Sequence, residues 1–213
     1  MNEIKNNYKI LKLTNTPMRQ DAFEYSDEEK INKIELLFAE IMEVMGLDLT
    51  DDSLKDTPRR VAKMFIKEQF SGLNPKNKPE INVFENKYGY HNMLVEKDIT
   101  LYSNCEHHFV PIIGKVHVAY IPHNKVLGLS KINRLVQYYA KRPQVQERLT
   151  LQIAEGLKEV LQHDDVAVYI EADHLCVASR GIKDTNSSTI TEIYCGKFED
   201  QVTQQKFLNH LKK

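Results

Sequence analysis

The stretch from Ile99 to His108, with the sequence ITLYSNCEHH, joins a strand pattern to a group of side chains that can bind a metal. Its first half alternates apolar and polar residues, as a half-buried strand does. Its second half supplies a thiol at Cys105 and imidazoles at His107 and His108. The stretch therefore predicts a strand that ends at, or turns into, a functional site.

A second segment with the same chemistry lies far downstream, at His174-Leu175-Cys176. Thiolates and imidazoles are the ligands that zinc prefers, and Cys₂His is a known catalytic combination. We predict that Cys105, His108 and Cys176 bind one zinc ion and leave a fourth position for water. The alternative is two buried thiols and some surface histidines, and spacing alone does not decide between these interpretations.

Length and composition limit the class of protein. The chain has 213 residues, of which 41% are hydrophobic, enough for one domain with an appended helical segment. The formal net charge of -1 argues against a nucleic-acid surface over the whole chain. Three cysteines, an odd number, and no early apolar segment predict a cytoplasmic protein whose thiols serve metal binding or chemistry. No apolar run is long enough to cross a membrane.

The first part of the chain predicts a flexible arm over residues 1–25 and a helical segment over 26–95. The arm is polar and mixed, and a partner subunit would order it. Ser26 and Glu29 form a capping-box pattern at the start of a helix, and Gly46 ends that helix. The apolar stripe of this helix predicts core packing. The stripe consists of Ile31, Ile34, Leu37, Phe38, Ile41 and Met45.

A second helix is expected to begin with Thr57 as its N-cap and Pro58 as its first residue, and to reach about Phe70. Arg59 and Arg60 lie in its first turn, where their charge opposes the helix dipole. The pair either meets an anion or is simply solvated, and this stretch alone does not distinguish the two.

From residue 96 to 213 the patterns predict a catalytic domain with strands and helices in groups. The expected strands cover 99–103, 110–121, 166–170 and 189–198, and the expected helices follow Ser130, follow Pro143 and cover 201–211. His117, inside the second strand, is interpreted as structural. Grouped rather than strictly alternating elements favour an α+β fold with an antiparallel sheet.

The sequence also contains cations that could hold phosphates. It has neither of the glycine-rich phosphate loops. The segment GLSKINR at 128–134 places Lys131 and Arg134 on one helix face, in a first turn that attracts anions. Arg180 follows Cys176 closely and would bring another guanidinium near the metal. Taken singly, each of these residues is also typical of an ordinary charged surface.

A possible base-reading group lies in the segment QVQER at 144–148. A carboxylate accepts two hydrogen bonds at once, and guanine presents two donors side by side at N1–H and its exocyclic amine. Glu147 can therefore read guanine, with Gln146 beside it. The alternative is a glutamate and a glutamine on an ordinary helix surface.

Four motifs together resemble the GTP cyclohydrolase I family, in matching order and from about residue 51 to 196. They are CEHHFVP at 105–111, GLSKINR at 128–134, RPQVQERLT at 142–150 and HxCVxxRG at 174–181. The resemblance implies a tunnelling fold, with helices on one face of the sheet, and a decamer of two pentameric rings with active sites between subunits. It also implies zinc-dependent conversion of GTP and water to 7,8-dihydroneopterin triphosphate and formate, the first step of tetrahydrofolate and pterin biosynthesis.

The resemblance also assigns roles residue by residue. Cys105, His108 and Cys176 correspond to zinc ligands, and His107 and His174 to catalytic histidines. The remaining assignments concern the substrate, with the guanine read by Glu147 and Gln146 and the ribose and triphosphate bound by Ser130, Lys131, Arg134, Arg180 and, from a neighbouring subunit, Arg60. Nothing in these motifs departs from the family pattern. Cys195 lies outside the ligand pattern and is expected to be a buried thiol.

Three other classes of protein are alternatives to this family. A nitrile reductase of queuosine biosynthesis has a related fold but uses a nucleophilic cysteine and NADPH, which the zinc ligands and phosphate-binding cations here argue against. A zinc nucleobase deaminase would carry an H-x-E…P-C-x-x-C signature, which the sequence lacks. A non-catalytic assembly module would instead use the zinc structurally, in a closed site with four ligands.

Overall fold

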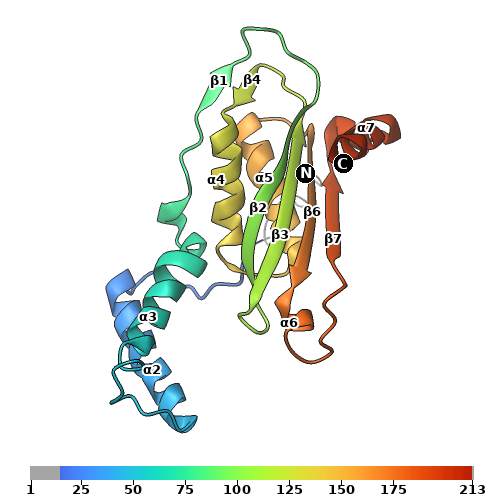
Figure 1. The fold of residues 1–213 in the computed structure, drawn as a ribbon. Helices are drawn as coiled ribbons and strands as arrows, with labels where there is room; N and C mark the ends of the chain where they lie inside the picture. Colours follow the sequence, from blue (N-terminus) through green and yellow to red (C-terminus); the bar gives the residue numbers. More distant parts are fainter. Residues whose placement is uncertain (1–14, 213) are drawn as a thin grey trace.

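The computed structural model describes residues 15–212, so the predicted arm at 1–25 lies largely outside the described residues. Its main element is a five-stranded sheet with strand order β5-β2-β3-β6-β7 (Figure 1). The strands are β2 (Leu94–Cys105), β3 (Pro111–Tyr120), β5 (Pro143–Gln144), β6 (Val166–His174) and β7 (Thr189–Tyr194). All neighbours are antiparallel except β5, which runs parallel to β2. The sheet is therefore mixed, and the predicted antiparallel arrangement holds for four of the five strands.

Two helices, α4 (Leu129–Ala140) and α5 (Gln146–Leu161), pack against each other and cover one face of the sheet (Figure 1). Each has an apolar stripe at helical spacing, which buries best against a flat apolar surface. The core between the layers is formed by Leu101, Val116, Val118, Val168 and Ile170 from the strands and by Ile132, Leu135, Val136, Leu149, Ile153 and Leu157 from the helices. This arrangement confirms the predicted α+β class.

Helix α4 runs along β2 in the same direction as that strand. Near its start, Asn133 Nδ2 donates to Glu96 Oε1 at 3.2 Å. One turn later Gln137 Nε2 donates to the Thr100 carbonyl at 2.7 Å. At its end the Ala140 carbonyl accepts from Ser103 Oγ at 2.7 Å. The N-terminus of α4 therefore lies at the opposite end of β2 from the Cys105 turn.

The N-terminal helices form a pair that projects beyond the sheet (Figure 1). They are α2 (Asp27–Val44) and α3 (Thr57–Lys63), with α3 continued by a π-helical turn at Met64–Gln69. The Ser26–Glu29 capping box and the positive φ of Gly46 are both present, as predicted. The pair is joined to the body through 3₁₀ turns at Ser71–Leu73 and Pro75–Asn77.

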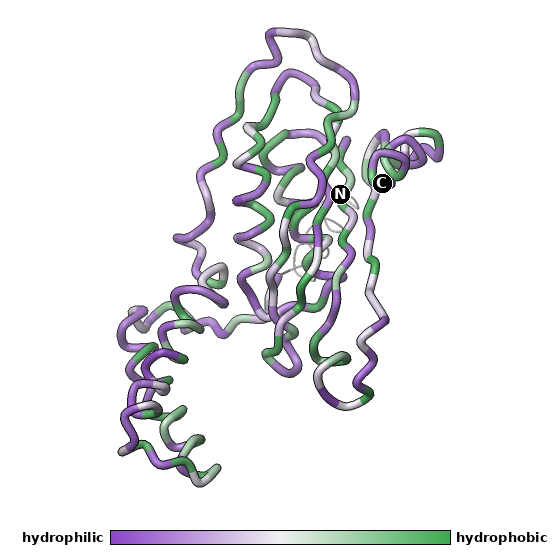
Figure 2. The backbone as a smooth tube through the Cα atoms, viewed as in Figure 1, coloured by the Kyte–Doolittle hydropathy of each residue, from purple (hydrophilic) through white to green (hydrophobic). Residues whose placement is uncertain are grey.

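The prediction that the α2 stripe packs into a core is wrong for Leu37, Ile41 and Met45, which are exposed, as is the neighbouring Val44 at 89%. The face of α2 that carries Ile31 and Met42 is buried, because it packs against α3 and the π-helical turn after it. Figure 2 shows hydrophobic residues along these projecting helices, beyond the end of the sheet. Periodicity identifies an apolar face but not which part of the molecule covers it.

Several predicted boundaries shift for identifiable reasons. Helix α4 is capped by Gly128 and not by Ser130, because the chain turns into it directly from the short strand β4 (Lys125–Leu127). Helix α5 begins at Gln146, because Pro143 and Gln144 pair with β2 as a strand. Strand β4 pairs with β1 (Val83–Glu85) in a separate small sheet.

The chain ends as predicted, with helix α7 (Gln201–Leu211), which follows a 3₁₀ turn at Gly196–Glu199. The last strand, predicted to cover 189–198, ends at Tyr194 because the chain enters this turn. Phe198 from the turn and Phe207 from α7 are fully buried against Ala119 and Ala167. No helix among residues 15–212 is long and apolar enough to cross a membrane.

We predict that Gly114→Ala destabilises the sheet. A Cβ at Gly114 would lie 2.5 Å from Ala172 Cα and closer still to the Glu171 carbonyl oxygen, because β3 and β6 approach closely there. Overpacking against backbone should lower the free energy of unfolding by about 1–3 kcal/mol, measured by chemical denaturation. As a control, Gly128→Ala adds the same methyl group where nothing is nearer than 3.6 Å. An equal loss in both variants would contradict the proposed clash.

Candidate metal centre

The first half of the site is the tight turn between β2 and β3. Cys105 ends β2 and is buried. Its amide donates to the Val110 carbonyl at 2.9 Å, and its own carbonyl accepts from the Phe109 amide at 2.8 Å. Phe109 takes a φ of 53°, a left-handed conformation that closes the turn. The turn thereby presents His107 and His108 outside the sheet.

An aromatic contact holds this turn against the N-terminal segment. The Phe109 ring lies 5.0 Å from the Phe70 ring and 6.2 Å from the Phe65 ring, centroid to centroid. Aromatic pairs at these separations stabilise one another beyond the area they bury. The contact offsets part of the cost of the left-handed backbone at Phe109.

The second half of the site arrives through strand pairing. β6 pairs with β3 so that His174 lies opposite Ile112, and the chain continues into the short helix α6 (Leu175–Ala178). This register places Cys176 beside the β2–β3 turn. The ligand atoms of Cys105, His108 and Cys176 all lie within 4.8 Å of one another. The structure thus brings together the three residues predicted as ligands.

The electrostatics of the group suit a cation. Burial raises the pKa of the Cys176 thiol, and a hydrogen bond with the neighbouring Cys105 thiol raises it further. The thiolate is the form of cysteine that binds a metal, so a dication bound here would displace the Cys176 proton. The donor set fits a borderline-soft transition metal. Arg180, predicted from sequence, also lies here, with its Nη1 2.9 Å from His108 Nε2.

The two predicted catalytic histidines flank this group in different environments. His107 is 65% exposed, with Nδ1 3.8 Å from Cys105 Sγ and Nε2 3.8 Å from Glu106 Oε1. His174 is half-buried, with Nε2 2.8 Å from Gln146 Oε1. Burial lowers the pKa of His174, and the charges of Glu147 and Asp173 oppose that effect. His174 is therefore the more constrained of the two imidazoles.

The first turn of α5 reaches both halves of the site. Glu147, predicted to read guanine, is exposed there. Gln146, predicted to read guanine beside it, is instead buried at 1% exposure with its amide bonded to protein groups. Consecutive residues of a helix point in different directions around its axis, so Gln146 can face the core while Glu147 faces solvent.

An ion pair that was not predicted from the sequence stabilises the turn that carries Cys105 and His108. Arg148 Nη2 pairs with Glu106 Oε2, and Arg148 also donates to Gln144 Oε1 at 3.1 Å and to the Pro143 carbonyl at 3.1 Å. The pair is mostly shielded from water, where such charge-assisted bonds are strongest. The only signal in the sequence is an acidic residue inside the ligand motif, and its partner is 42 residues away.

The predicted phosphate-binding cations lie far from this metal group within one chain. Ser130, Lys131 and Arg134 are at the start of α4, beside Glu96 on β2. From there to Cys105 the strand spans nine residues, about 30 Å at the usual rise per residue. Arg60 lies on α3 with its side chain 72% exposed. The structure therefore brings Arg180 to the metal group and places Ser130, Lys131 and Arg134 at the other end of β2.

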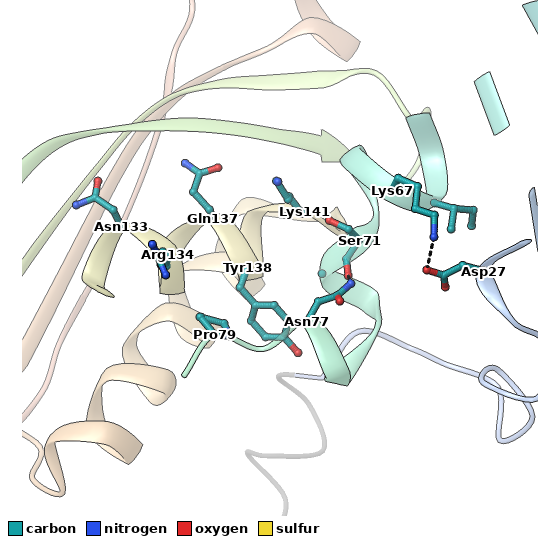
Figure 3. Close-up of a pocket in the computed structure, with 12 residues that line it drawn as sticks. Asp27, Lys67, Ser71, Asn77, Pro79, Asn133, Arg134, Gln137, Tyr138 and Lys141 are labelled. Carbon is teal, nitrogen blue, oxygen red and sulfur yellow. Dashed lines mark hydrogen bonds and ion pairs between the residues drawn. The ribbon is translucent and has the colours of Figure 1, made fainter. Parts of the chain in front are cut away.

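Arg134 instead lines a cavity of about 550 Å³ between α4 and the N-terminal segment. Figure 3 shows Arg134, Gln137 and Lys141 along α4 on one side, with Lys67 and its ion pair to Asp27 on the other. Three of these five side chains are cationic. The cavity therefore has more positive than negative charge in its lining, and none of the three predicted metal ligands lines it.

A second group of possible ligands consists of His123, His163 and Asp165. Its two imidazole rings are stacked, with centroids 4.2 Å apart and planes within 11°. Ring nitrogens bind a metal within the ring plane, so two parallel stacked rings do not converge on one ion. His163 Nδ1 also accepts from the Asp165 amide at 3.1 Å. We interpret this group as a structural contact.

The fold and the site define a class of protein: an α+β chain that gathers two thiols and an imidazole at one end of its sheet. The sequence profile of the GTP cyclohydrolase I family matches residues 34–212. Proteins named GTP cyclohydrolase 1 are 59% identical in Flavobacterium johnsoniae, over 92% of this chain and 88% of the relative, and 52% identical in Vibrio vulnificus, over 92% and 90%. One from Mannheimia succiniciproducens is 53% identical, over 93% and 90%.

The chain belongs to the GTP cyclohydrolase I family and is an enzyme of that type. This confirms the resemblance carried by the four sequence motifs.

We predict that Cys176→Ala abolishes metal binding while Cys195→Ala leaves it intact. Cys176 is one of the three converging ligands, whereas Cys195 is a partly buried thiol outside the group. Metal content of the purified variants, measured by plasma mass spectrometry, should fall to background in the first and match the parent protein in the second. Retention of metal by Cys176→Ala would remove this residue from the site.

Proposed function

We propose that this enzyme converts GTP and water to 7,8-dihydroneopterin triphosphate and formate, the first step of tetrahydrofolate and pterin biosynthesis. The observation that carries the proposal is the convergence of Cys105, His108 and Cys176 within 4.8 Å in a chain of this family. GTP is a cytoplasmic metabolite, so the same proposal places the enzyme in the cytoplasm.

Zinc is the cofactor that this donor set suits best, held by Cys105, His108 and Cys176. When bound, it would supply a Lewis acid that makes water nucleophilic near neutral pH. Three protein ligands are typical of catalytic zinc, because the remaining position is open to a substrate or water.

The bond changes balance with one water consumed overall. Water adds at C8 of guanine, and opening of the ring requires a proton at N7. A second water releases C8 as formate. The ribose then opens and rearranges, and ring closure on the freed amine expels one water. A positioned imidazole suits each proton transfer, and we assign these transfers to His174 and His107.

Glu147 is the proposed reader of guanine. Its exposed carboxylate, next to the buried Gln146, can accept hydrogen bonds from N1–H and from the exocyclic amine together. Adenine presents no such pair of donors, so the contact would discriminate GTP from ATP. Arg180, 2.9 Å from His108, is the cation of the same chain that lies near enough to meet the substrate beside the metal.

We further propose that each active site is completed by a neighbouring subunit. Ser130, Lys131 and Arg134 lie about 30 Å from the metal group of their own chain, too far to share its substrate. A second copy would bring its α4 N-terminus to this group. Arg60 on α3, 72% exposed and held only by a surface ion pair with Asp56 at 3.6 Å among the described contacts, would reach an adjacent chain. The triphosphate would then be bound across the interface.

The sheet has edges that such an assembly would cover. Among residues 15–212 no strand pairs with the outer edge of β7, and β5 pairs with β2 only at Asn104 and Cys105. An open edge presents unpaired N–H and C=O groups that can pair with a strand of another chain. Edge-to-edge pairing of subunits would build the tunnelling fold, and the proposed assembly is a decamer of two pentamers. The division into a helical segment at 26–95 and a catalytic domain at 96–213 belongs to the same proposal.

The reaction is tested by incubating the purified protein with GTP and assaying formate. We expect formate release and a pterin product with GTP, and neither product with ATP. A zinc chelator should abolish release, and added zinc, but not magnesium, should restore it. Turnover that survives complete removal of zinc would contradict the proposed role of the metal.

Absence of formate from zinc-loaded, oligomeric protein would contradict the reaction itself. It would favour the alternative in which the metal is structural and the protein serves assembly. Zinc-dependent folding in the absence of GTP turnover would be the matching observation for that alternative.

The shared site is tested by subunit complementation. Lys131→Ala and Cys176→Ala should each be inactive, because one loses a phosphate contact and the other the metal. Mixed oligomers refolded from both variants should regain part of the activity, since some sites then combine an intact Lys131 from one chain with an intact Cys176 from another. Mixed oligomers without activity would indicate that both residues must act within one chain.

A further inference from the structure

The side chain of Gln146 is a buried amide whose hydrogen-bonding groups all meet protein partners. Its Nε2 donates to the Thr189 carbonyl at 2.9 Å and contacts Thr191 Oγ1 at 3.1 Å and the Ile170 carbonyl at 3.3 Å. Its Oε1 lies 2.8 Å from His174 Nε2. A side chain so enclosed has nothing left to offer a substrate.

The orientation of this amide follows from its partners. The carbonyls of Thr189 and Ile170 can only accept hydrogen bonds, so the group that faces them must be the NH₂. The opposite orientation would turn Oε1 toward two carbonyl oxygens and leave buried acceptors unpaired, at a cost of several lost hydrogen bonds. Gln146 Oε1 therefore faces His174.

A chain of hydroxyl groups fixes the same orientation independently. Thr150 Oγ1 donates its one hydrogen to the Gln146 backbone carbonyl at 2.8 Å. The contact of 2.7 Å between the Thr150 and Thr191 hydroxyls must then be donated by Thr191. With its hydrogen used, Thr191 Oγ1 can only accept from Gln146 Nε2. Every proton in this network is thereby assigned.

The network determines the tautomer of the catalytic imidazole. An amide oxygen only accepts, so the hydrogen in the contact between Gln146 and His174 belongs to His174 Nε2. We infer that Gln146 is a positioning residue that holds neutral His174 with its hydrogen on Nε2 and leaves Nδ1 as the nitrogen that takes up a proton. Gln146 thus acts through His174 and not on guanine.

This inference deepens the proposed function and rests on it for the role of His174. A general base must present its lone pair to the proton that it accepts. Neutral imidazole has two tautomers, and fixing one of them before substrate binds keeps the lone pair on Nδ1. The threonine and carbonyl partners come from three segments, β6, β7 and α5. The Gln146 amide that fixes the tautomer is therefore itself fixed by buried partners in the core.

The tautomer is measured directly by solid-state NMR of the zinc-loaded oligomer labelled with ¹³C,¹⁵N-histidine. At alkaline pH the ring is neutral, and the protonated nitrogen is identified by whether its ¹⁵N signal correlates with Cδ2 or with Cγ. Subtraction of the spectrum of His174→Gln assigns the signal. We expect the protonated nitrogen to correlate with Cδ2, as Nε2 does. A hydrogen on Nδ1 would overturn the inference, whether or not the protein turns over GTP.

The kinetic test uses Gln146→Leu, with Gln152→Leu as the control. Both replace a buried glutamine on α5. Gln146 Oε1 meets His174 Nε2 at 2.8 Å, whereas Gln152 Oε1 accepts from Gln144 Nε2 at 2.8 Å. Gln146→Leu should lower kcat by about 10²-fold, the scale of one positioned acid–base group, with KM for GTP changed less than about threefold. Gln152→Leu should change neither by more than about threefold.

Two outcomes would contradict the positioning role. A rise in KM with kcat retained, together with weaker discrimination between GTP and ATP, would return Gln146 to guanine reading. An equal loss of kcat in both variants would attribute the effect to a disturbed core. The NMR measurement needs no substitution at Gln146, so it still decides the inference if Gln146→Leu fails to fold. Loss of formate release from the parent protein would instead refute the proposed function.

Discussion

The pairing of β3 with β6 is the interaction on which the site depends. Their register runs from Tyr120 opposite Val166 to Ile112 opposite His174, and its last pair brings Cys176 against the turn that carries Cys105. A slip of one residue would turn every side chain of β6 to the other face of the sheet, so the buried apolar face and the metal group are specified together. The register is strongly constrained because one face of β6 is buried, with Val168, Ile170 and Ala172, while Glu171 and Asp173 on the other face are exposed.

The first turn of α5 then connects the two halves of the site. Gln146 holds His174, next to one ligand segment, while Arg148 holds Glu106 inside the other. Both contacts are shielded from water, where a hydrogen bond left unmade costs more than one at the surface. Glu147, between them, faces outward. One helical turn thus combines two inward contacts that keep the chemistry in place with one outward group that can meet a substrate.

If the cations of α4 bind the triphosphate as proposed, a single chain cannot complete the site, for a geometric reason. The cations at the start of α4 and the metal group lie at opposite ends of β2, because α4 runs in the direction of that strand. On the same chain Leu37, Ile41 and Met45 of α2 are exposed, and among residues 15–212 no strand pairs with the outer edge of β7. Assembly from several copies would resolve both features at once, by covering apolar surface and by placing cations beside a neighbour's metal. Substrate binding and assembly would then be coupled.

The sequence by itself determined the long strands and helices, the α+β class, the family and the candidate ligands Cys105, His108 and Cys176, because periodicity and ligand chemistry can be read along the chain. The short strands β1, β4 and β5 have no such signal. It did not indicate that Gln146 turns inward, that Arg148 pairs with Glu106, or that half of the α2 stripe stays uncovered. These features depend on which segments meet in space and on which groups compete for the same hydrogen bonds. Such contacts join residues tens of positions apart, so only the tertiary structure decided them.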